Sequence, residues 1–166
     1  MVGRNNSSAK SAEREVLITR IIHAPRQLVW KAWTDPKHMA QWWGPHGFTN
    51  PVCELDVRPG GAIRIHMRGP DGVVYPMTGT FREIVEPERL VFMAVAEDLQ
   101  GNPLLEALTT VTFAEQGGKT KLTVRAKAVG LAPVAPQMLA GMEAGWTQSL
   151  ERLAELVAST GAPQAG

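Results

Sequence analysis

The sequence predicts a single α+β domain in which a curved antiparallel sheet of about seven strands wraps around a long C-terminal helix. Three observations predict this fold class. Residues 50–128 alternate apolar and polar side chains between regularly spaced turns, which is typical of antiparallel strands. Residues after Gly130 change to helical spacing. The chain of 166 residues has the length of one domain and can bury a sizeable core.

A strand and two short helices are predicted to follow a polar tail over residues 1–13. A run of β-branched side chains after this tail is typical of a strand, and Pro25 ends it. Pro25 also stands at the first position of a short amphipathic helix, whose apolar residues recur every three or four positions. Asp35 then caps a second short helix, which is expected to end near Trp43.

Six further strands are predicted between residues 50 and 128. Clusters of Gly, Pro, Asn and Asp divide this stretch at intervals of roughly 8–12 residues, and such residues are typical of turns. Every second side chain between the clusters is apolar, so one face of the sheet is expected to be buried. The glycine-containing turns at 60–61 and 69–72 join strand to strand, whereas a phosphate-binding loop opens a helix.

The longest helix is predicted to begin near Pro136 and to complete a single domain over residues 14–160, with a second tail at 161–166. Its apolar residues share one stripe: Leu139, Met142, Trp146, Leu150, Leu153 and Val157. Only this helix is long enough to cover the apolar face of the sheet. A helix held by a curved sheet commonly leaves space beside its middle, which here carries Gly141 and Gly145.

Composition and charge exclude several classes of function. The 17 basic and 16 acidic residues give a net charge of +1, which provides no attraction to nucleic acid or to an anionic membrane. No apolar run approaches the roughly 20 residues of a membrane span, and the first residues lack the apolar stretch of a signal peptide. A single cysteine permits no internal disulfide, so a cytoplasmic protein is expected. The histidines lack metal-ligand spacing, and we expect no metal or cofactor.

Aromatic and thioether side chains predict an apolar ligand cavity between the long helix and the sheet. Aromatic walls are usual in apolar pockets, and flexible methionines adapt to irregular ligand shapes. The candidate ligand-binding residues are Trp43, Phe48, Ile65, Met67, Met77, Phe92, Met142 and Trp146. Trp42 and Trp43 point about 100° apart on a helix, so one is expected to lie deeper than the other. The alternative that all these side chains simply fill the core stays open.

Few side chains could serve in catalysis, and none is assigned a catalytic role. Cys53 has no neighbouring histidine to lower its pKa and is expected to be a buried structural thiol. His66 alternates with apolar neighbours and is expected to face solvent. Glu143 is the carboxylate expected nearest to the cavity, and an enzyme would need it to act with His46 or Tyr75.

A series of motifs along the chain resembles one protein family. The motifs are Ala24-Pro25, Val29-Trp30, Thr34-Asp35-Pro36, Gln41-Trp42-Trp43-Gly44-Pro45, Asp56-Val57-Arg58-Pro59-Gly60-Gly61, Met67-Arg68-Gly69-Pro70-Asp71-Gly72, Pro87-Glu88-Arg89-Leu90-Val91, Gly118-Lys119-Thr120 and Gly145-Trp146. Their order resembles the helix-grip, START-like superfamily known as SRPBCC, in the branch similar to the activator of the heat-shock-protein-90 ATPase. The resemblance covers about residues 14 to 158, and it implies the fold predicted above.

Three functions follow as hypotheses. The first is a non-enzymatic START-like domain that binds a small hydrophobic or aromatic molecule between the helix and the sheet. The second is implied by the resemblance alone and is a partner of the chaperone that stimulates its ATPase. The third is a cyclase or hydrolase that uses the same cavity. A homodimer paired through sheet edges also stays open, because no heptad or exposed apolar patch in the sequence fixes the oligomeric state.

Overall fold

The computed structural model describes residues 13–160, and its elements confirm the predicted fold class. The predicted tails lie outside the described residues, except that Glu13 already belongs to the first strand. The strands are β1 (Glu13–Ile22), β2 (Thr49–Leu55), β3 (Ala62–Arg68), β4 (Val74–Val85), β5 (Arg89–Glu97), β6 (Pro103–Gln116) and β7 (Lys119–Gly130). The helices are α2 (Arg26–Thr34), α3 (Pro36–Trp42), α4 (Ala135–Ala140) and α5 (Met142–Thr160).

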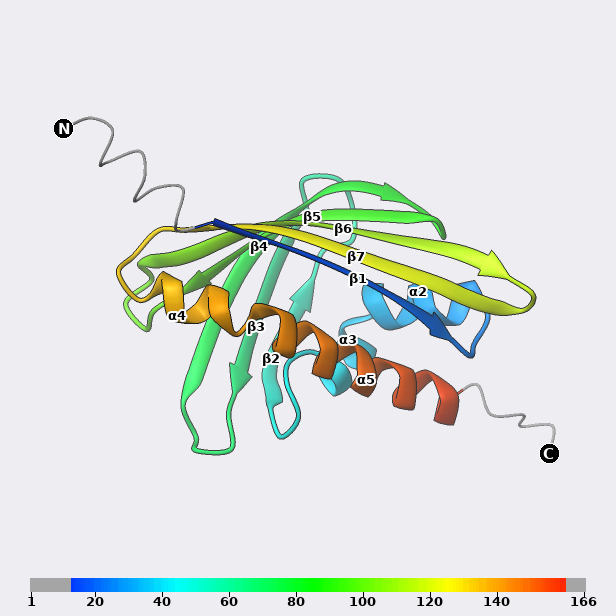
Figure 1. The fold of residues 1–166 in the computed structure, drawn as a ribbon, viewed down its shortest axis with the longest axis horizontal. Coiled ribbons are helices and arrows are strands. Elements are labelled where there is room, and N and C mark those ends of the chain that lie inside the picture. The colour runs from blue at the N-terminus through cyan, green and yellow to red at the C-terminus, as the bar shows by residue number, and fades with distance from the viewer. Residues whose placement is uncertain (1–12, 161–166) are drawn as a thin grey trace.

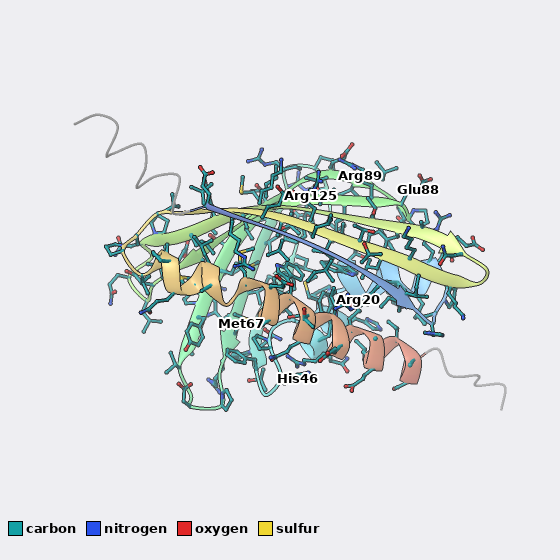
Figure 2. All side chains as sticks on the ribbon, in the orientation of Figure 1. Arg20, His46, Met67, Glu88, Arg89 and Arg125 are labelled. Carbon is teal, nitrogen blue, oxygen red and sulfur yellow. The ribbon has the colours of Figure 1, made fainter. Side chains whose placement is uncertain are left out.

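The seven strands form one antiparallel sheet in the order β1-β7-β6-β5-β4-β3-β2. The sheet curves around α5, and α2 and α3 lie at one end of the same concave side (Figure 1). The convex side carries exposed ion pairs, such as Arg125 with Glu15 at 3.0 Å and Arg89 with Glu83 at 2.7 Å (Figure 2). The core therefore lies between the concave face and the helices, as the period-two pattern predicts.

The start signals of the two short helices act as the sequence indicates, with one small shift. Pro25 precedes α2 in an extended conformation and stands at the N-cap, so the helix begins at Arg26 rather than at the proline. The Asp35 carboxylate accepts a hydrogen bond of 2.9 Å from the Lys37 N–H and caps α3. Burial acts to raise the pKa of Asp35, but this hydrogen bond and nearby His38 lower the pKa overall.

The prediction of one uninterrupted C-terminal helix is wrong, because the helix is interrupted at Gly141. The helix α4 ends there and α5 begins at Met142, which produces the step visible in Figure 1. Glycine is a poor helix former, since it loses the most backbone freedom on ordering. The Gly141 N–H is shared between the carbonyls of Gln137 at 3.3 Å and Met138 at 3.2 Å, a tightening typical of a helix end.

A cluster of aromatic side chains lies where α2 and α3 meet the sheet. Trp33 is fully buried there, and its ring contacts Trp42 at 4.7 Å and Phe113 at 6.3 Å in edge-to-face geometry. It also stacks against Trp146 of α5 at 6.1 Å. This aromatic cluster fixes one end of α5 against the sheet. Among the described residues, none of the helices combines the length and apolar character needed to cross a membrane.

Candidate ligand-binding site

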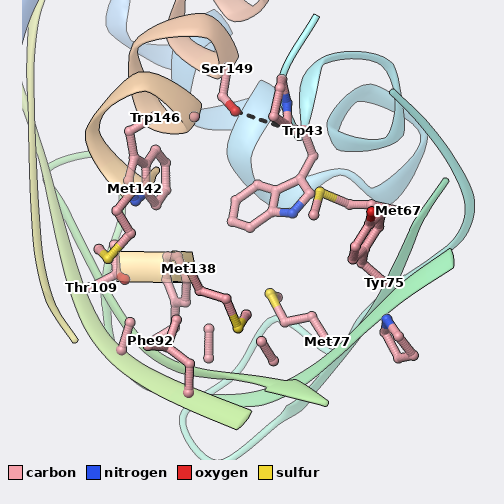
Figure 3. A pocket seen from close by; sticks show the side chains of 18 residues that line it. Trp43, Met67, Tyr75, Met77, Phe92, Thr109, Met138, Met142, Trp146 and Ser149 are labelled. Carbon is pink, nitrogen blue, oxygen red and sulfur yellow. Dashed lines mark hydrogen bonds between the residues drawn. The ribbon is translucent and has the colours of Figure 1, made fainter. Parts of the chain in front are cut away.

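A cavity of about 270 Å³ lies between the two C-terminal helices and the concave face of the sheet (Figure 3). This volume is just below the roughly 300–1,000 Å³ typical of small-molecule pockets. The residues that line the cavity are Trp43, Gly44, Pro45, Met67, Tyr75, Pro76, Met77, Phe92, Ala94, Ala96, Leu105, Ala107, Thr109, Met138, Met142, Gly145, Trp146 and Ser149. Tyr75 is 43% exposed to solvent, so the cavity reaches the surface on the side of β4.

The cavity exists because small residues occupy one row of the sheet. Gly79, Ala94, Ala107 and Ala128 are successive cross-strand partners on β4, β5, β6 and β7. The next row on the same face begins with Phe81 and Phe92, whose large side chains fill the space beneath α2 and α3. Side chains on one face of a sheet stand roughly perpendicular to it, so the short side chains of Ala94 and Ala107 leave open space in front of the C-terminal helices.

Side chains on the helix side of the cavity are also incompletely packed. Leu150 and Leu153 are buried as the apolar stripe of α5 predicts, but Met142 and Trp146 on the same stripe are only half-buried. Both line the cavity, and Met138 of α4 adds a third side chain from this side. The stripe was therefore predicted correctly, while its middle faces open space rather than the sheet.

Trp43 forms the wall between the cavity and the aromatic cluster. Its ring meets Trp146 edge to face at 5.5 Å, and only 8% of Trp43 is exposed. Gly44 follows with a φ of +99°, which favours glycine, and a Cβ there would stand 2.9 Å from the Met67 sulfur. The turn after α3 thus brings Trp43 and Met67 together at one side of the cavity.

Arg152 of α5 holds this turn in place. Its Nη1 donates to the carbonyls of Trp43 at 3.2 Å, Gly44 at 2.9 Å and Pro45 at 3.0 Å, and its Nη2 donates to Gln41 at 3.0 Å. Burial lowers the pKa of the guanidinium, and only the charge of nearby Glu155 opposes this effect. We call this set of four hydrogen bonds the Arg152 clamp.

Three neighbours of Arg152 add further bonds to the same turn. Ser149 Oγ accepts from the Gly44 N–H at 3.1 Å, and Gln148 Oε1 accepts from the His46 N–H at 3.1 Å. The His46 ring lies 2.8 Å from the Glu151 carboxylate in an exposed pair. The turn that carries Trp43 is consequently tied to α5 through four helix positions, 148, 149, 151 and 152.

Six of the eight predicted site residues line the cavity, and two do not. Trp43, Met67, Met77, Phe92, Met142 and Trp146 line it. Ile65 is fully buried beside a separate void of about 10 Å³ among core residues. Phe48 packs against Tyr75 at 5.9 Å and supports the cavity wall from behind. The expected difference in depth between the two adjacent tryptophans is confirmed, since Trp42 is fully buried and donates its indole N–H to the Ala32 carbonyl at 2.8 Å.

The pairing that an enzyme was expected to need is wrong. Glu143 points out of the cavity, is 64% exposed and accepts a hydrogen bond of 3.1 Å from Arg14. Its position lies about 100° around the helix from Met142, which is enough to take the carboxylate away from the cavity. His46 is paired with Glu151, so of the three residues only Tyr75 lines the cavity.

Cys53 and His66 also differ from expectation. Cys53 was expected to be buried and His66 to face solvent, but both side chains are half-buried. Burial raises the pKa of the Cys53 thiol to about 11, and the charges of Asp35 and Glu54 act in the same direction. Such a thiol is a poor nucleophile at neutral pH. Among residues 13–160, no group of three or more His, Cys, Asp and Glu side chains is placed to hold a metal ion.

Sequence reasoning missed the polar groups, the small residues and one methionine of the site. Met138, Thr109 and Ser149 line the cavity without having been predicted. The alanines at alternate positions of β5 and β6 were the available signal, because a buried strand face built from small side chains leaves a hollow.

Residues 23–158 match the family described as Activator of Hsp90 ATPase homolog 1-like protein. This chain belongs to that family. Among curated proteins, none matches the chain significantly. The membership agrees with the predicted resemblance and extends over the whole cavity, whose lining runs from Trp43 to Ser149.

Several solved bacterial structures share the fold of this AHSA1-like domain. A protein from Rhizobium leguminosarum is 26% identical with a TM-score of 0.75, and covers 89% of this chain and 95% of its own. A protein from Chromobacterium violaceum is 29% identical with a TM-score of 0.72, with 86% and 96% covered. An AHSA1 protein from Silicibacter pomeroyi is 21% identical with a TM-score of 0.71, with 89% and 99% covered, and shows the fold alone.

Proposed function

We propose that this AHSA1-like domain is a non-enzymatic START-like module that binds a small hydrophobic or aromatic molecule in the cavity beside α5. The observation that carries the proposal is the exposure of Met142 and Trp146 to a cavity of about 270 Å³, on a helix stripe that is otherwise buried. An apolar ligand would give these two side chains the van der Waals contacts that the small side chains of the sheet, such as Ala94 and Ala107, do not provide.

The chemistry of the lining supports an adaptable apolar site. Four of the seven methionines of the chain line the cavity, namely Met67, Met77, Met138 and Met142. Methionine side chains bend around irregular shapes and make favourable contacts with aromatic rings. Trp43 and Trp146 provide two ring surfaces at right angles, 5.5 Å apart between centroids, which suits a flat ligand edge.

Titration of intrinsic tryptophan fluorescence tests this proposal. We expect a saturable change with a Kd of about 10 µM or tighter for at least one member of a panel of polyketide-like aromatics, flavonoids, sterols and fatty acids. The Trp146→Phe variant should weaken that Kd about tenfold, because it removes ring area from the cavity wall. Trp30→Phe is the matched control, since Trp30 is buried against Phe113 and does not line the cavity.

Two outcomes would contradict the proposal. The first is the absence of any saturable response across the panel. The second is an equal loss of affinity in Trp146→Phe and Trp30→Phe, which would reduce Trp146 to a residue of the general core.

The alternative function is stimulation of a chaperone ATPase, and the description of the matching family favours it. The test is the steady-state ATPase rate of the purified chaperone with and without this protein. A rate increase that saturates with added protein would establish the alternative, and an unchanged rate at saturating protein would reject it. The Arg152 clamp gives a useful variant here, because its loss would disturb the cavity wall without altering the exposed convex face.

The proposal includes a setting for this activity. We place the domain in the cytoplasm, where a single cysteine stays reduced. It would work without metal or cofactor and without nucleic acid or membrane as a partner, consistent with its net charge of +1. Edge strands β1 and β2 are the surfaces through which two copies could pair.

A further inference from the structure

Thr109 carries a buried hydroxyl group that the protein leaves without a partner. The residue lies on β6 at the floor of the cavity, beside Phe92 and Met142 (Figure 3), and is 1% exposed. Its Oγ1 forms no hydrogen bond with the described residues, and it is not among the fully enclosed side-chain atoms that lack a partner, so it borders the open space of the cavity. Buried side-chain hydroxyls nearly always have a partner, and an unmade hydrogen bond costs stability.

The other buried hydroxyl groups are bonded within the protein. Three polar residues are buried among the described residues: Thr109, Thr120 and Ser149. Thr120 Oγ1 donates to the Ala24 carbonyl at 2.8 Å, and Ser149 Oγ accepts from the Gly44 N–H at 3.1 Å. The unpartnered hydroxyl is therefore the one on the floor of the cavity, between the apolar cross-strand partners Phe92 and Ala126.

A second unpartnered donor lies on the opposite wall. The Trp43 indole nitrogen has no hydrogen bond to the described residues, and Figure 3 shows it turned toward the cavity. An indole N–H can only donate, whereas a hydroxyl can donate or accept. A ligand that carries a hydrogen-bond acceptor, such as a carbonyl oxygen, can therefore bond to both of these groups, whereas an amine that only donates cannot bond to the indole N–H.

The lining also sets the charge of the ligand. None of the 18 lining residues is Asp, Glu, Lys, Arg or His. A carboxylate or ammonium group bound there would lose its hydration without gaining an opposite charge, which costs far more than a neutral carbonyl group would.

We propose that the ligand of this cavity is an uncharged molecule whose carbonyl oxygen accepts a hydrogen bond from Thr109 Oγ1, while its apolar body lies against Met142 and Trp146. This inference rests on the proposed function and narrows it, since ionised fatty acids and other carboxylates are excluded. Thr109 selects the ligand, and the methionines and tryptophans supply most of its binding surface.

Three probes with one skeleton test the inference by calorimetry or fluorescence: 2-acetylnaphthalene, 2-ethylnaphthalene and 2-naphthoate. The first carries a neutral carbonyl group, the second has a methylene group in its place, and the third has an ionised carboxylate in place of the acetyl group. We expect the ketone to bind at least tenfold more tightly than the carboxylate. Thr109→Val, which keeps the side-chain shape, should weaken the ketone about tenfold and leave the hydrocarbon unchanged or tighter.

Thr110→Val is the matched control, because Thr110 is the next residue of β6 and faces the opposite side of the sheet. It should change neither affinity. The melting temperature of the free protein gives a second readout. Thr109→Val should raise it, because the substitution removes an unsatisfied hydroxyl, and Thr120→Val should lower it, because that hydroxyl is bonded.

The outcomes separate this inference from the proposed function. If Thr109→Val changes the affinity of ketone and hydrocarbon equally or changes neither, the hydrogen bond is refuted while cavity binding stands. If 2-naphthoate binds as tightly as the ketone, the neutral class is refuted. If none of the three probes binds to the unmodified protein, both the proposed function and this inference fall.

Discussion

The Arg152 guanidinium donates a hydrogen bond of 2.9 Å to the Gly44 carbonyl, and this bond joins the C-terminal helix to the turn that carries the cavity wall. The two residues are 108 positions apart in the chain. Helix α5 therefore both covers the sheet and determines where Trp43 stands. Ligand binding and the stability of the fold share this contact.

Loss of the Arg152 clamp should destabilise the protein strongly. Arg152→Met keeps much of the apolar stem but removes four hydrogen bonds from a charged, partly buried donor. We expect the free energy of unfolding to fall by about 2–4 kcal/mol in urea denaturation. Arg89→Met is the control, since its exposed pair with Glu83 is worth at most about 1 kcal/mol. Equal effects of the two substitutions would contradict the importance of the clamp.

Filling the cavity should remove binding without unfolding the protein. Ala107→Leu places three extra carbon atoms in the open space opposite Trp146, so we expect probe affinity to fall at least about tenfold with unfolding free energy changed by less than about 1 kcal/mol. Ala128→Leu is the matched control from the same row. Ala128 is 2% exposed and outside the cavity, so overpacking should cost about 1–3 kcal/mol. A cavity already filled in solution would give the two variants similar losses of stability.

Truncation along the α5 stripe should have unequal effects. Leu153→Ala removes fully buried contacts and should cost about 2–5 kcal/mol of unfolding free energy. Met142→Ala should cost less than about 1.5 kcal/mol, because the Met142 side chain is half-buried and borders existing space. Chemical denaturation of both variants measures the difference. A cost for Met142→Ala as large as that for Leu153→Ala would show that its neighbours pack as tightly as the rest of the core.

The Cys53 thiol should titrate far above neutral pH. Burial, with the charges of Asp35 and Glu54, raises its pKa from the ordinary 9.0 to about 11. Thiolate absorbance in the ultraviolet, with Cys53→Ser as baseline, should give a midpoint near that value. Between pH 9 and 11 the unfolded chain releases the thiol proton while the folded protein keeps it. The stabilisation from Cys53 is complete below pH 9 and is lost as pH rises through 11, and Cys53→Ser should flatten this decline. A midpoint near 9 would contradict the effect of burial.

Local patterns in the sequence were sufficient for the element order and for the buried faces. Period-two alternation identified the strand faces, and the Asp35 cap identified the start of α3, because both depend on nearest neighbours along the chain. The same patterns missed the break at Gly141. A continuous apolar stripe from Leu139 to Val157 does not reveal that one glycine between its members interrupts the backbone.

The composition of the site depended on relationships between distant strands. Ile65 and Met77 are direct partners across β3 and β4, yet only Met77 reaches the cavity, because Ile65 lies one strand farther along the row and is enclosed among core residues. Glu143 follows Met142 in the chain but points away from the cavity, because successive positions of a helix are rotated by about 100°. The partnerless hydroxyl of Thr109 depends on the side chains that strands and helices distant in the sequence bring to the cavity, and no local pattern records these.

The alanine row has a consequence for how this family can diversify. Recognisable motifs of the chain lie in turns and helix starts, whereas Ala94 and Ala107, which fix the depth of the hollow, lie in none of them. Exchanging a methyl group for a larger or smaller side chain at these two positions would alter ligand size in a single mutational step. Relatives with the same motifs could thus evolve different ligand selectivities. Membership of the family would then predict the fold and the position of the cavity, but not the ligand.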